Sequence, residues 1–333
     1  TANLRLRSND AYTAGGKAGF RPDRTVDTYT KILKKLYPHT PVVVGGIEAS
    51  LRRLTHYDYW SDKLQRSILL TSGADLLVYG MGDKVISEVA RAMRNGFNMK
   101  LLRGIRQVGF RADSEYVKKL CQGRTIVLHS FEECEQDKAR FAENFTRIEQ
   151  LSNMMECDTT LVERAGDEYV VITPPNTTLT TEELDHSFDL PYTRLPHPRY
   201  KGKRIPAYDM IKHSVNIHRG CFGGCNFCSI AFHQGRAITT RSKQSVVDEA
   251  KLLTQKPNFK GYIHDVGGPT ANFRETACEK QLKDGVCTSR KCLAPTPCKN
   301  LEVDHREYAE LLLDIERIPK VKKVFVRSGI RFD

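Results

Sequence analysis

The sequence predicts an α/β protein with two domains: a Rossmann-like domain with a parallel sheet, followed by the opening half of a β/α barrel. Three observations predict it. Short apolar runs alternate with amphipathic helical patterns, prolines interrupt this alternation between residues 174 and 206, and a loop rich in cysteine and glycine follows a predicted strand. Because 333 residues suffice for two hydrophobic cores, we assign residues 1–205 and 206–333 to the two domains.

In the first domain, apolar runs precede helical patterns, as strands of a parallel sheet do when helices cover both faces. The predicted strands span residues 41–46, 74–80 and 125–128. The predicted helices, which carry apolar residues at helical spacing, span residues 24–36, 84–94 and 132–151.

The second domain repeats this alternation. The predicted strands span residues 214–218, 262–266 and 321–326, and the predicted helices span residues 245–255 and 308–318. This order, β-α-β-α-β, is typical of the first half of a β/α barrel. Half a barrel would expose a sheet edge and an apolar face, so we expect the sequence to be truncated relative to a longer protein.

The most informative feature is the C-x3-C-x2-C spacing of Cys221, Cys225 and Cys228. Three thiolates so close together can bind three irons of a [4Fe-4S] cluster and leave the fourth iron open to a substrate or cofactor. Neighbouring glycines can adopt positive φ and let the backbone wrap the cluster, and they stand at positions 220, 223 and 224. The alternatives are a redox Cys-x-x-Cys pair, half of a zinc site, or buried thiols.

A second set of cysteines follows the second predicted barrel strand. It consists of Cys278, Cys287, Cys292 and Cys298, in a stretch with little periodicity. Because long loops without regular structure need a source of stability, four thiols here indicate a second metal site, either zinc or an auxiliary iron–sulfur cluster. Reduced structural thiols are the alternative.

Composition limits the class of protein. The net charge of +12 and the isoelectric point near 9.2 favour anionic partners. Residues 199–204 are the densest basic stretch, which indicates a solvated linker or a nucleic-acid contact. No apolar run reaches the roughly 18 residues that cross a bilayer, and the cysteines have metal-like spacing. We therefore expect a cytoplasmic protein without a membrane partner.

Several stretches, each longer than a generic motif, resemble the YgiQ-type radical S-adenosylmethionine (SAM) proteins. They are residues 8–16, 45–53, 56–62, 219–229, 267–272 and 328–331. The resemblance implies a cobalamin-binding-like Rossmann domain before a radical SAM barrel, and a bacterial or archaeal cytoplasmic protein. It also implies a [4Fe-4S] cluster that cleaves SAM to a 5′-deoxyadenosyl radical, and an electron donor such as flavodoxin or ferredoxin.

The resemblance also implies which residues contact SAM. Phe227 is the aromatic residue that precedes the third cysteine in radical SAM proteins. Gly267, Gly268 and Pro269 stand where such enzymes often have Gly-Gly-Glu, so backbone carbonyls would accept from the methionyl ammonium group in place of the missing carboxylate. The Asp-x-His-x-x-Gly loop that supplies a cobalt-ligating histidine does not occur here, so the sequence does not favour cobalamin.

Two other stretches leave alternatives open. Gly45 and Gly46 follow a predicted strand, as at a nucleotide-binding turn, or serve close packing alone. Residues 56–62 combine aromatic and titratable side chains, and either line a substrate cleft or anchor one domain to the other. His218, Arg219, His233 and Arg236 flank the cysteine loop and are candidates to donate to the cluster or to SAM.

The function that these features predict is a radical SAM enzyme with an unknown substrate. The alternative is a non-enzymatic zinc or iron–sulfur module, acting as an RNA binder or an electron carrier. Neither the specific reaction nor a catalytic side chain can be read from the sequence.

Overall fold

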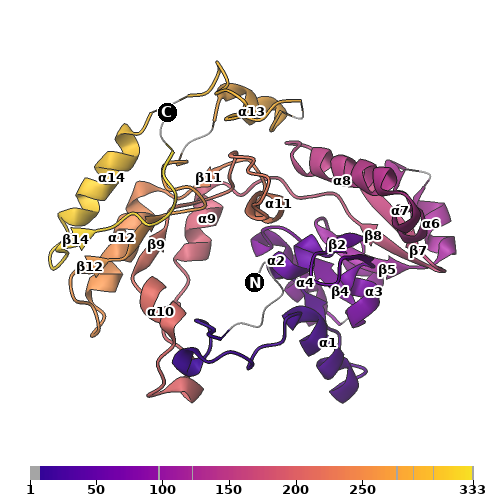
Figure 1. Cartoon of the computed structure of the whole chain (residues 1–333), viewed down its shortest axis with the longest axis horizontal. Helices are drawn as coiled ribbons and strands as arrows, with labels where there is room; N and C mark the ends of the chain where they lie inside the picture. Colours follow the sequence, from indigo (N-terminus) through magenta and orange to yellow (C-terminus); the bar gives the residue numbers. More distant parts are fainter. Residues whose placement is uncertain are drawn as a thin grey trace.

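The computed structural model describes residues 8–96, 98–121, 123–274, 277–287, 289–302 and 304–331. Figure 1 shows two α/β domains, the N-terminal one in indigo to magenta and the second in orange to yellow. The N-terminal sheet has six strands in the order β1-β4-β5-β8-β7-β6. Their bounds are Val43–Val44 (β1), Leu76–Val78 (β4), Val108–Ala112 (β5), Thr125–Val127 (β6), Thr160–Ala165 (β7) and Glu168–Ile172 (β8).

This sheet is mixed, which corrects the predicted parallel, Rossmann-like sheet. Strands β1 and β4 are parallel, as are β6 and β7. Strand β5 lies antiparallel between β4 and β8, and β7 and β8 form an antiparallel hairpin. The three predicted strands exist as β1, β4 and β6, but the prediction missed β5, β8 and β7, which lie between β4 and β6.

Helices cover both faces of this sheet because apolar side chains point to both sides of its strands. One face packs against α1 (Thr25–Leu36), α2 (Gly46–Leu51), α3 (Ile68–Ser72) and α8 (Lys138–Ser152). The other packs against α4 (Asp83–Arg94), α5 (Met99–Leu102) and α6 (Ser114–Leu120). The predicted helix over residues 132–151 is divided, because Asp137 leaves helical geometry after α7 (Phe131–Gln136) and caps α8.

The segment rich in proline crosses between the domains and contains short helices that the sequence did not predict. They are α9 (Thr181–Phe188), the 3-10 turn η2 (Pro198–Tyr200) and α10 (Pro206–Ile211). Near the N-terminus, the turn η1 (Ala14–Gly16) packs against this segment, where Gly15 N donates to Arg204 O at 2.7 Å and Ala207 N donates to Ala11 O at 2.8 Å.

The second domain has the predicted β-α-β-α-β order. Strand β9 (Ser214–Asn216) is parallel to β13 (Asp265–Gly267), and β12 (Tyr262–Ile263) is parallel to β14 (Lys323–Val324). The Val266 amide of β13 donates to Phe325 O, directly after β14, at 3.1 Å. This bond links the β9–β13 pair to the β12–β14 pair. Helices α12 (Lys243–Thr254) and α14 (Arg306–Glu316) bury their apolar faces against these strands.

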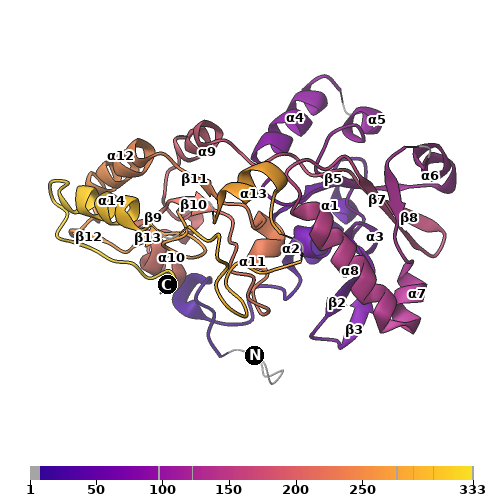
Figure 2. The same ribbon diagram turned by 90° about the horizontal axis from the view of Figure 1, so that it is seen from above.

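The remaining elements lie around the cysteine loop. They are the short strands β10 (His218–Arg219) and β11 (Thr239–Thr240) and the helices α11 (Ile230–Gln234) and α13 (Glu279–Asp284). Figure 2 places α11 beside α2 of the N-terminal domain. In the described part of the chain, no helix combines the length and hydropathy needed to cross a bilayer. The domain boundary near residue 205 stays a prediction.

Candidate functional site

One edge of the N-terminal sheet faces the cysteine loop. Strands β1, β4 and β8 run in the same direction, so the turns that follow them lie at this edge. The side chain of Gln107 joins two of these turns: its Nε2 donates to Tyr79 O at 2.6 Å and Met81 O at 2.8 Å, and its Oε1 accepts from Asn176 N at 3.2 Å. Ligands commonly bind at the carboxyl ends of strands in α/β sheets.

Helix α2 docks on α11, the helix that follows the cysteine loop. Ser50 Oγ of α2 accepts from Gly80 N at 2.9 Å and hydrogen-bonds with His233 Nδ1 of α11 at 2.9 Å. Arg219, just before the loop, pairs with Asp83 of the N-terminal domain at 2.7 Å. Burial lowers the pKa of His233, with further lowering from two nearby arginines. These contacts fix the cysteine loop against the N-terminal domain.

The geometry of the cysteine loop requires glycine at position 220. Gly220 has φ of +87°, and a Cβ there would overlap the carbonyl group of Ala237. A Cβ on Gly223 would lie 3.4 Å from the Sγ of Cys221 and 3.8 Å from the Sγ of Cys225. The two sulfurs therefore flank a space that a side chain would fill.

The donor set fits an iron–sulfur cluster in its chemistry. Among the described residues, no three His, Cys, Asp or Glu side chains are gathered closely enough to hold one metal ion. The loop offers three thiolates, each of which can bind a different iron of a [4Fe-4S] cluster, whereas a structural zinc site takes four ligands around one ion. Cys225 is exposed and Cys221 and Cys228 are half-buried, so all three thiols can be reached.

The residues expected to contact SAM lie beside this loop, in different environments. Gly267 O accepts from Ile217 N at 2.9 Å within the β9–β13 pairing, so this carbonyl is already used. The carbonyl expected to accept from SAM is therefore that of Gly268. A Cβ on Gly268 would lie 2.5 Å from the ring of His218, so packing alone already requires glycine there. Pro269 is half-buried, and Phe227 is 92% exposed.

His218, which the sequence predicts as a donor to the cluster or to SAM, is a buried polar residue. Its side chain is fully buried, and neither ring nitrogen has a hydrogen-bond partner among the described residues. Burial lowers its pKa to about 4, so the ring is neutral at physiological pH. The imidazole packs directly below the Gly267–Gly268 turn, where it shapes the backbone expected to meet SAM.

Residues 328–331 brace the same turn. Ser328 Oγ donates to Asp265 Oδ2 at 2.7 Å. Asn272 and Arg331 exchange two hydrogen bonds, each at 2.9 Å, between the amide side chain of one and the backbone of the other. Two stretches that are distant in the sequence therefore hold each other in place.

The second set of cysteines surrounds a buried member, Cys292, which is 7% exposed. Burial raises the pKa of the Cys292 thiol, and the charges of Cys278, Cys287 and Cys298 raise it further, while Arg236 opposes them. The other three thiols are therefore near enough to Cys292 to affect it electrostatically. Gln281 Nε2 also donates to Cys292 Sγ at 3.4 Å.

The segment that carries these cysteines, residues 277–302, reaches from the second domain to the first. Val286 N donates to Asn153 O at 3.0 Å, at the end of α8, and Met154 forms a β-bridge with Gly285. Lys291 Nζ donates to Asn226 Oδ1 of the cysteine loop at 2.6 Å.

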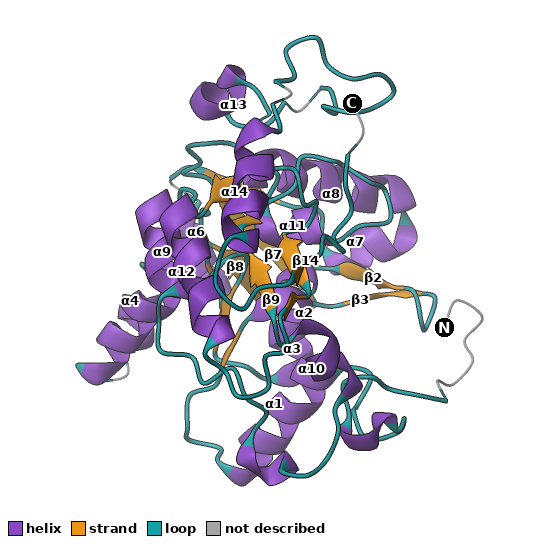
Figure 3. Ribbon diagram, turned by 90° about the vertical axis from the view of Figure 1, so that its left-hand side faces the viewer, coloured by secondary structure: helices purple, strands orange, loops and turns teal. Residues whose placement is uncertain are grey.

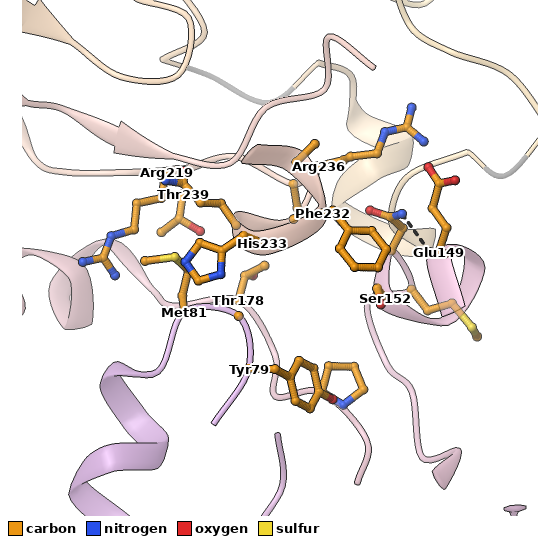
Figure 4. A pocket seen from close by; sticks show the side chains of 18 of the residues that line it. Tyr79, Met81, Glu149, Ser152, Thr178, Arg219, Phe232, His233, Arg236 and Thr239 are labelled. Carbon is orange, nitrogen blue, oxygen red and sulfur yellow. Dashed lines mark hydrogen bonds between the residues drawn. The ribbon is translucent and has the colours of Figure 1, made fainter. Parts of the chain in front are cut away.

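A cavity of about 510 Å³ lies between the two domains and this segment. Cys225 and Cys228 line it, together with residues from the sheet edge, α8 and α11. Figure 4 shows Phe232 and His233 pointing into the space on the side of Tyr79.

Comparison with known proteins identifies the family. The profile of the "Radical SAM N-terminal" family matches residues 1–214. A "UPF0313 protein" of Porphyromonas gingivalis is 50% identical over the whole chain, which covers 52% of that protein. Those of Bacteroides thetaiotaomicron and Clostridium botulinum are 48% and 46% identical, with 55% and 51% of their lengths covered.

The chain belongs to the "Radical SAM N-terminal" family. The predicted YgiQ-type identity is therefore confirmed. The chain spans about half the length of the curated relatives it matches. A solved structure of the radical SAM methyltransferase TsrM from Kitasatospora setae, with tryptophan and a SAM analogue bound, aligns with 79% of this chain and 35% of its own, at 18% identity and a TM-score of 0.39. A second TsrM structure, with cobalamin and a [4Fe-4S] cluster, gives a TM-score of 0.38 over 74% of this chain and 34% of its own, at 18% identity.

In this chain, the stretches that carry the resemblance fall into two groups. Residues 45–53 contain α2, which contacts α11 directly after residues 219–229, beside the cavity. Residues 56–62 instead form β2 (His56–Asp58) and the turn that leads to β3 (Lys63–Gln65), in a hairpin visible in Figure 3, and do not line the cavity. Tyr57, Tyr59 and Trp60 are 51%, 54% and 44% exposed, so the predicted cleft or anchor role has no support there.

The sequence interpretation missed the rim residues Tyr79, Gln107 and Asn176. A signal existed for Asn176, because the β-branched run Val170–Ile172 precedes Pro174 and Pro175 and marks a strand with a turn after it. Gln107 had no comparable signal, since its role depends on loops that come together only in the fold.

Proposed function

We propose that this chain binds a [4Fe-4S] cluster through Cys221, Cys225 and Cys228 and acts as a radical SAM enzyme on a substrate still to be identified. The observation that carries the proposal is the C-x3-C-x2-C loop, in a radical SAM family member, with two of its cysteines lining an interdomain cavity. When bound and reduced, such a cluster supplies the electron that cleaves SAM to a 5′-deoxyadenosyl radical, which removes a hydrogen atom from the substrate.

The chain's own residues would position the cofactors. The open space at Gly223 lets the Cys221 and Cys225 thiolates approach a cluster. The Gly268 carbonyl is the proposed acceptor for the methionyl ammonium group of SAM, with Pro269 supplying no side-chain acceptor. The exposed ring of Phe227 is available to pack on a bound cofactor. The contact between Ser50 and His233 holds α11, and thereby the cysteine loop, against the cavity.

A second metal centre at Cys278, Cys287, Cys292 and Cys298 is also proposed. The electrostatic effect of the other three thiols on Cys292 supports it. Because no three of the described metal-ligating side chains are gathered around one point, the four thiols would draw together around zinc or around an auxiliary iron–sulfur cluster. Cobalamin is not included, because the cobalt-ligating loop is missing from these residues. We further propose a cytoplasmic location and a flavodoxin or ferredoxin as electron donor.

The test is anaerobic reconstitution of the protein that carries this chain, followed by reduction with dithionite in the presence of SAM. Formation of 5′-deoxyadenosine, measured by mass spectrometry, is expected, together with a change in the electron paramagnetic resonance spectrum of the cluster when SAM is added. Cys225→Ser should abolish both signals, while the exposed thiol of Cys121 provides the matched control Cys121→Ser. A full cluster with neither product nor spectral change would refute the proposal, and zinc without iron would favour the non-enzymatic module.

A further inference from the structure

The cavity beside the cysteine loop carries positive charge that the protein does not neutralise. Five cationic side chains line it, and of these Lys84 pairs with Glu183 and Arg219 pairs with Asp83. The other three are Arg53, Arg236 and Lys291. Among the described residues none of these three has a carboxylate within 4 Å, and Glu149 is the only carboxylate in the lining.

Arg53 is more deeply buried than Arg236. It is 3% exposed, and its guanidinium lies over the rings of Tyr79 and Phe232, 5.0 Å and 4.6 Å from their centroids. Its Nη1 donates to Ser50 O at 2.6 Å, but Nε has no partner among the described atoms. A buried charge without a counter-ion is costly, so this arginine favours an anion in the adjacent space.

Arg236 and Asn176 add further donors without acceptors. Arg236 is 8% exposed, and its Nε and Nη2 are both buried without a partner in the described part of the chain. Asn176 Nδ2, from the opposite domain, is also buried and unpartnered there. Figure 4 shows Arg236 beside α11, on the side of the cavity where Glu149 lies. Residues of both domains that line this cavity therefore carry buried, unsatisfied donors, and the cavity offers few acceptors.

The rest of the lining suits an apolar body of limited size. Phe145, Phe232 and Tyr79 contribute aromatic rings, and Met154 and Met155 contribute flexible thioethers. A volume of about 510 Å³ is in the range of small-molecule sites. Cys221, Gly267 and Gly268 do not line the cavity, so it is separate from the turn expected to hold the methionyl end of SAM.

We infer that this cavity binds the substrate of the proposed reaction, and that the substrate is a small molecule with a carboxylate or phosphate group. Arg53 and Arg236 bind the anionic group, Asn176 donates a further hydrogen bond, and the aromatic rings pack against the apolar part. The term substrate rests on the proposed function, whereas the anion site rests on the charges and unpartnered donors alone. Cys225 and Cys228 in the lining bring the bound molecule close to the cluster loop.

The test uses cluster-loaded protein with two probes, phenyl phosphate and phenylacetate, and benzyl alcohol as the neutral reference. Ligand-observed NMR titration should detect binding of at least one anionic probe and not of benzyl alcohol, and the tighter probe identifies the preferred anion. Arg236→Gln and Arg53→Gln should each weaken binding at least tenfold, with unchanged metal content. Arg317→Gln, at an exposed arginine on the far helix α14, should leave it unchanged.

Because the buried arginines also support the fold, Asn176→Asp provides a second test. It adds a negative charge at the cavity and should weaken the binding of the anionic probes at least tenfold, as the arginine variants do. The inference would be overturned if no probe bound. It would also be overturned if folded Arg236→Gln and Asn176→Asp bound the probes as tightly as the parent protein does. Displacement of the probe by SAM but not by methylthioadenosine would assign the site to the carboxylate of SAM and overturn it too. Cleavage of SAM is measured separately. If the protein cleaves SAM but binds no probe, only the cavity inference is refuted. If it binds the probe but leaves SAM intact, only the proposed reaction is refuted.

Discussion

At the scale of single residues, Gly268 illustrates how packing and cofactor binding impose the same requirement. Its Cα faces the ring of His218, which is fully buried and lies where a Cβ would be. The carbonyl of the same residue is the proposed acceptor for SAM. Glycine at this position therefore serves the protein before any cofactor binds.

Gly268→Ala should destabilise the protein by about 1–3 kcal/mol, because the added methyl group overpacks the site against His218. Urea denaturation measures the loss. Gly329→Ala is the control, since a Cβ on Gly329 would meet nothing within 4 Å. The double variant His218→Ala with Gly268→Ala should recover part of the loss relative to the sum of the single changes. Strictly additive effects would contradict the contact.

A second residue gives a dependence on pH. Glu163 is 3% exposed in strand β7, where its Oε2 accepts from Thr55 N at 2.7 Å. Burial raises its pKa to about 7, despite the hydrogen bonds from Thr55, which lower it. The folded state therefore holds this proton more tightly than the unfolded chain does. The free energy of unfolding contributed by this group falls as pH rises from about 4.5 to about 7.

Glu163→Gln removes this titration and keeps an acceptor for Thr55. Relative to the parent protein, the variant should gain about 3 kcal/mol of stability between pH 4.5 and pH 8, which corresponds to the shift of the pKa. Chemical denaturation at several pH values measures it, and the exposed Glu168→Gln on β8 is the control. Parallel pH profiles for parent and Glu163→Gln would show that the group titrates normally.

At the scale of elements, Gln107 links the turns that follow β4 and β8, which are also joined by the bond from the Tyr79 hydroxyl to Thr173 O at 2.7 Å. Its side chain bonds the carbonyls of Tyr79 and Met81 and the amide of Asn176, and these residues form one rim of the cavity. The element that carries Gln107 is the turn before β5, a strand that the sequence interpretation did not include.

Gln107→Leu should cost about 2–3 kcal/mol, because it leaves the buried carbonyl of Tyr79 and its neighbours without their donor at nearly constant side-chain volume. Urea denaturation again provides the measurement. The exposed Gln150→Leu on α8 controls for the loss of an amide. A change below 0.5 kcal/mol would mean that water replaces these bonds.

The elements also show what local sequence patterns can predict. The helices α1, α4, α12 and α14 carry apolar residues at helical spacing along their length, and each was predicted within two residues at its ends. Strand β7 was missed because buried Glu163 interrupts its apolar run, although Gly166 marks the hairpin turn to β8. The cavity could not be predicted, since contacts such as that between Ser50 and His233 join residues 183 positions apart.

At the scale of the whole molecule, residues 277–302 connect the two domains across the cavity. The proposed second metal centre lies within this segment, so metal should hold the connection in place. Removing that metal should therefore release the segment before either domain unfolds.

Limited trypsin digestion tests this expectation, because Lys280, Lys283, Arg290, Lys291 and Lys299 offer cleavage sites there. Treatment with a chelator or an oxidant should increase cleavage within the segment at least fivefold, while sites in α4 such as Arg91 keep their rate. Restoration by zinc alone or only by iron and sulfide distinguishes the two kinds of centre. Equal cleavage with and without metal would argue for simple reduced thiols.

The docking of α2 on α11 has a consequence for engineering this family. One domain contributes Ser50 and Arg53 to this contact, and the other contributes Phe232 and His233. The docking surfaces of the two domains therefore fit each other. A chimaera that joins one relative's first domain to another's barrel at residue 205 would juxtapose surfaces that did not evolve together. Transferring α2 and α11 together should restore the docking of the two domains in such a chimaera. The two helices should therefore be exchanged as a pair.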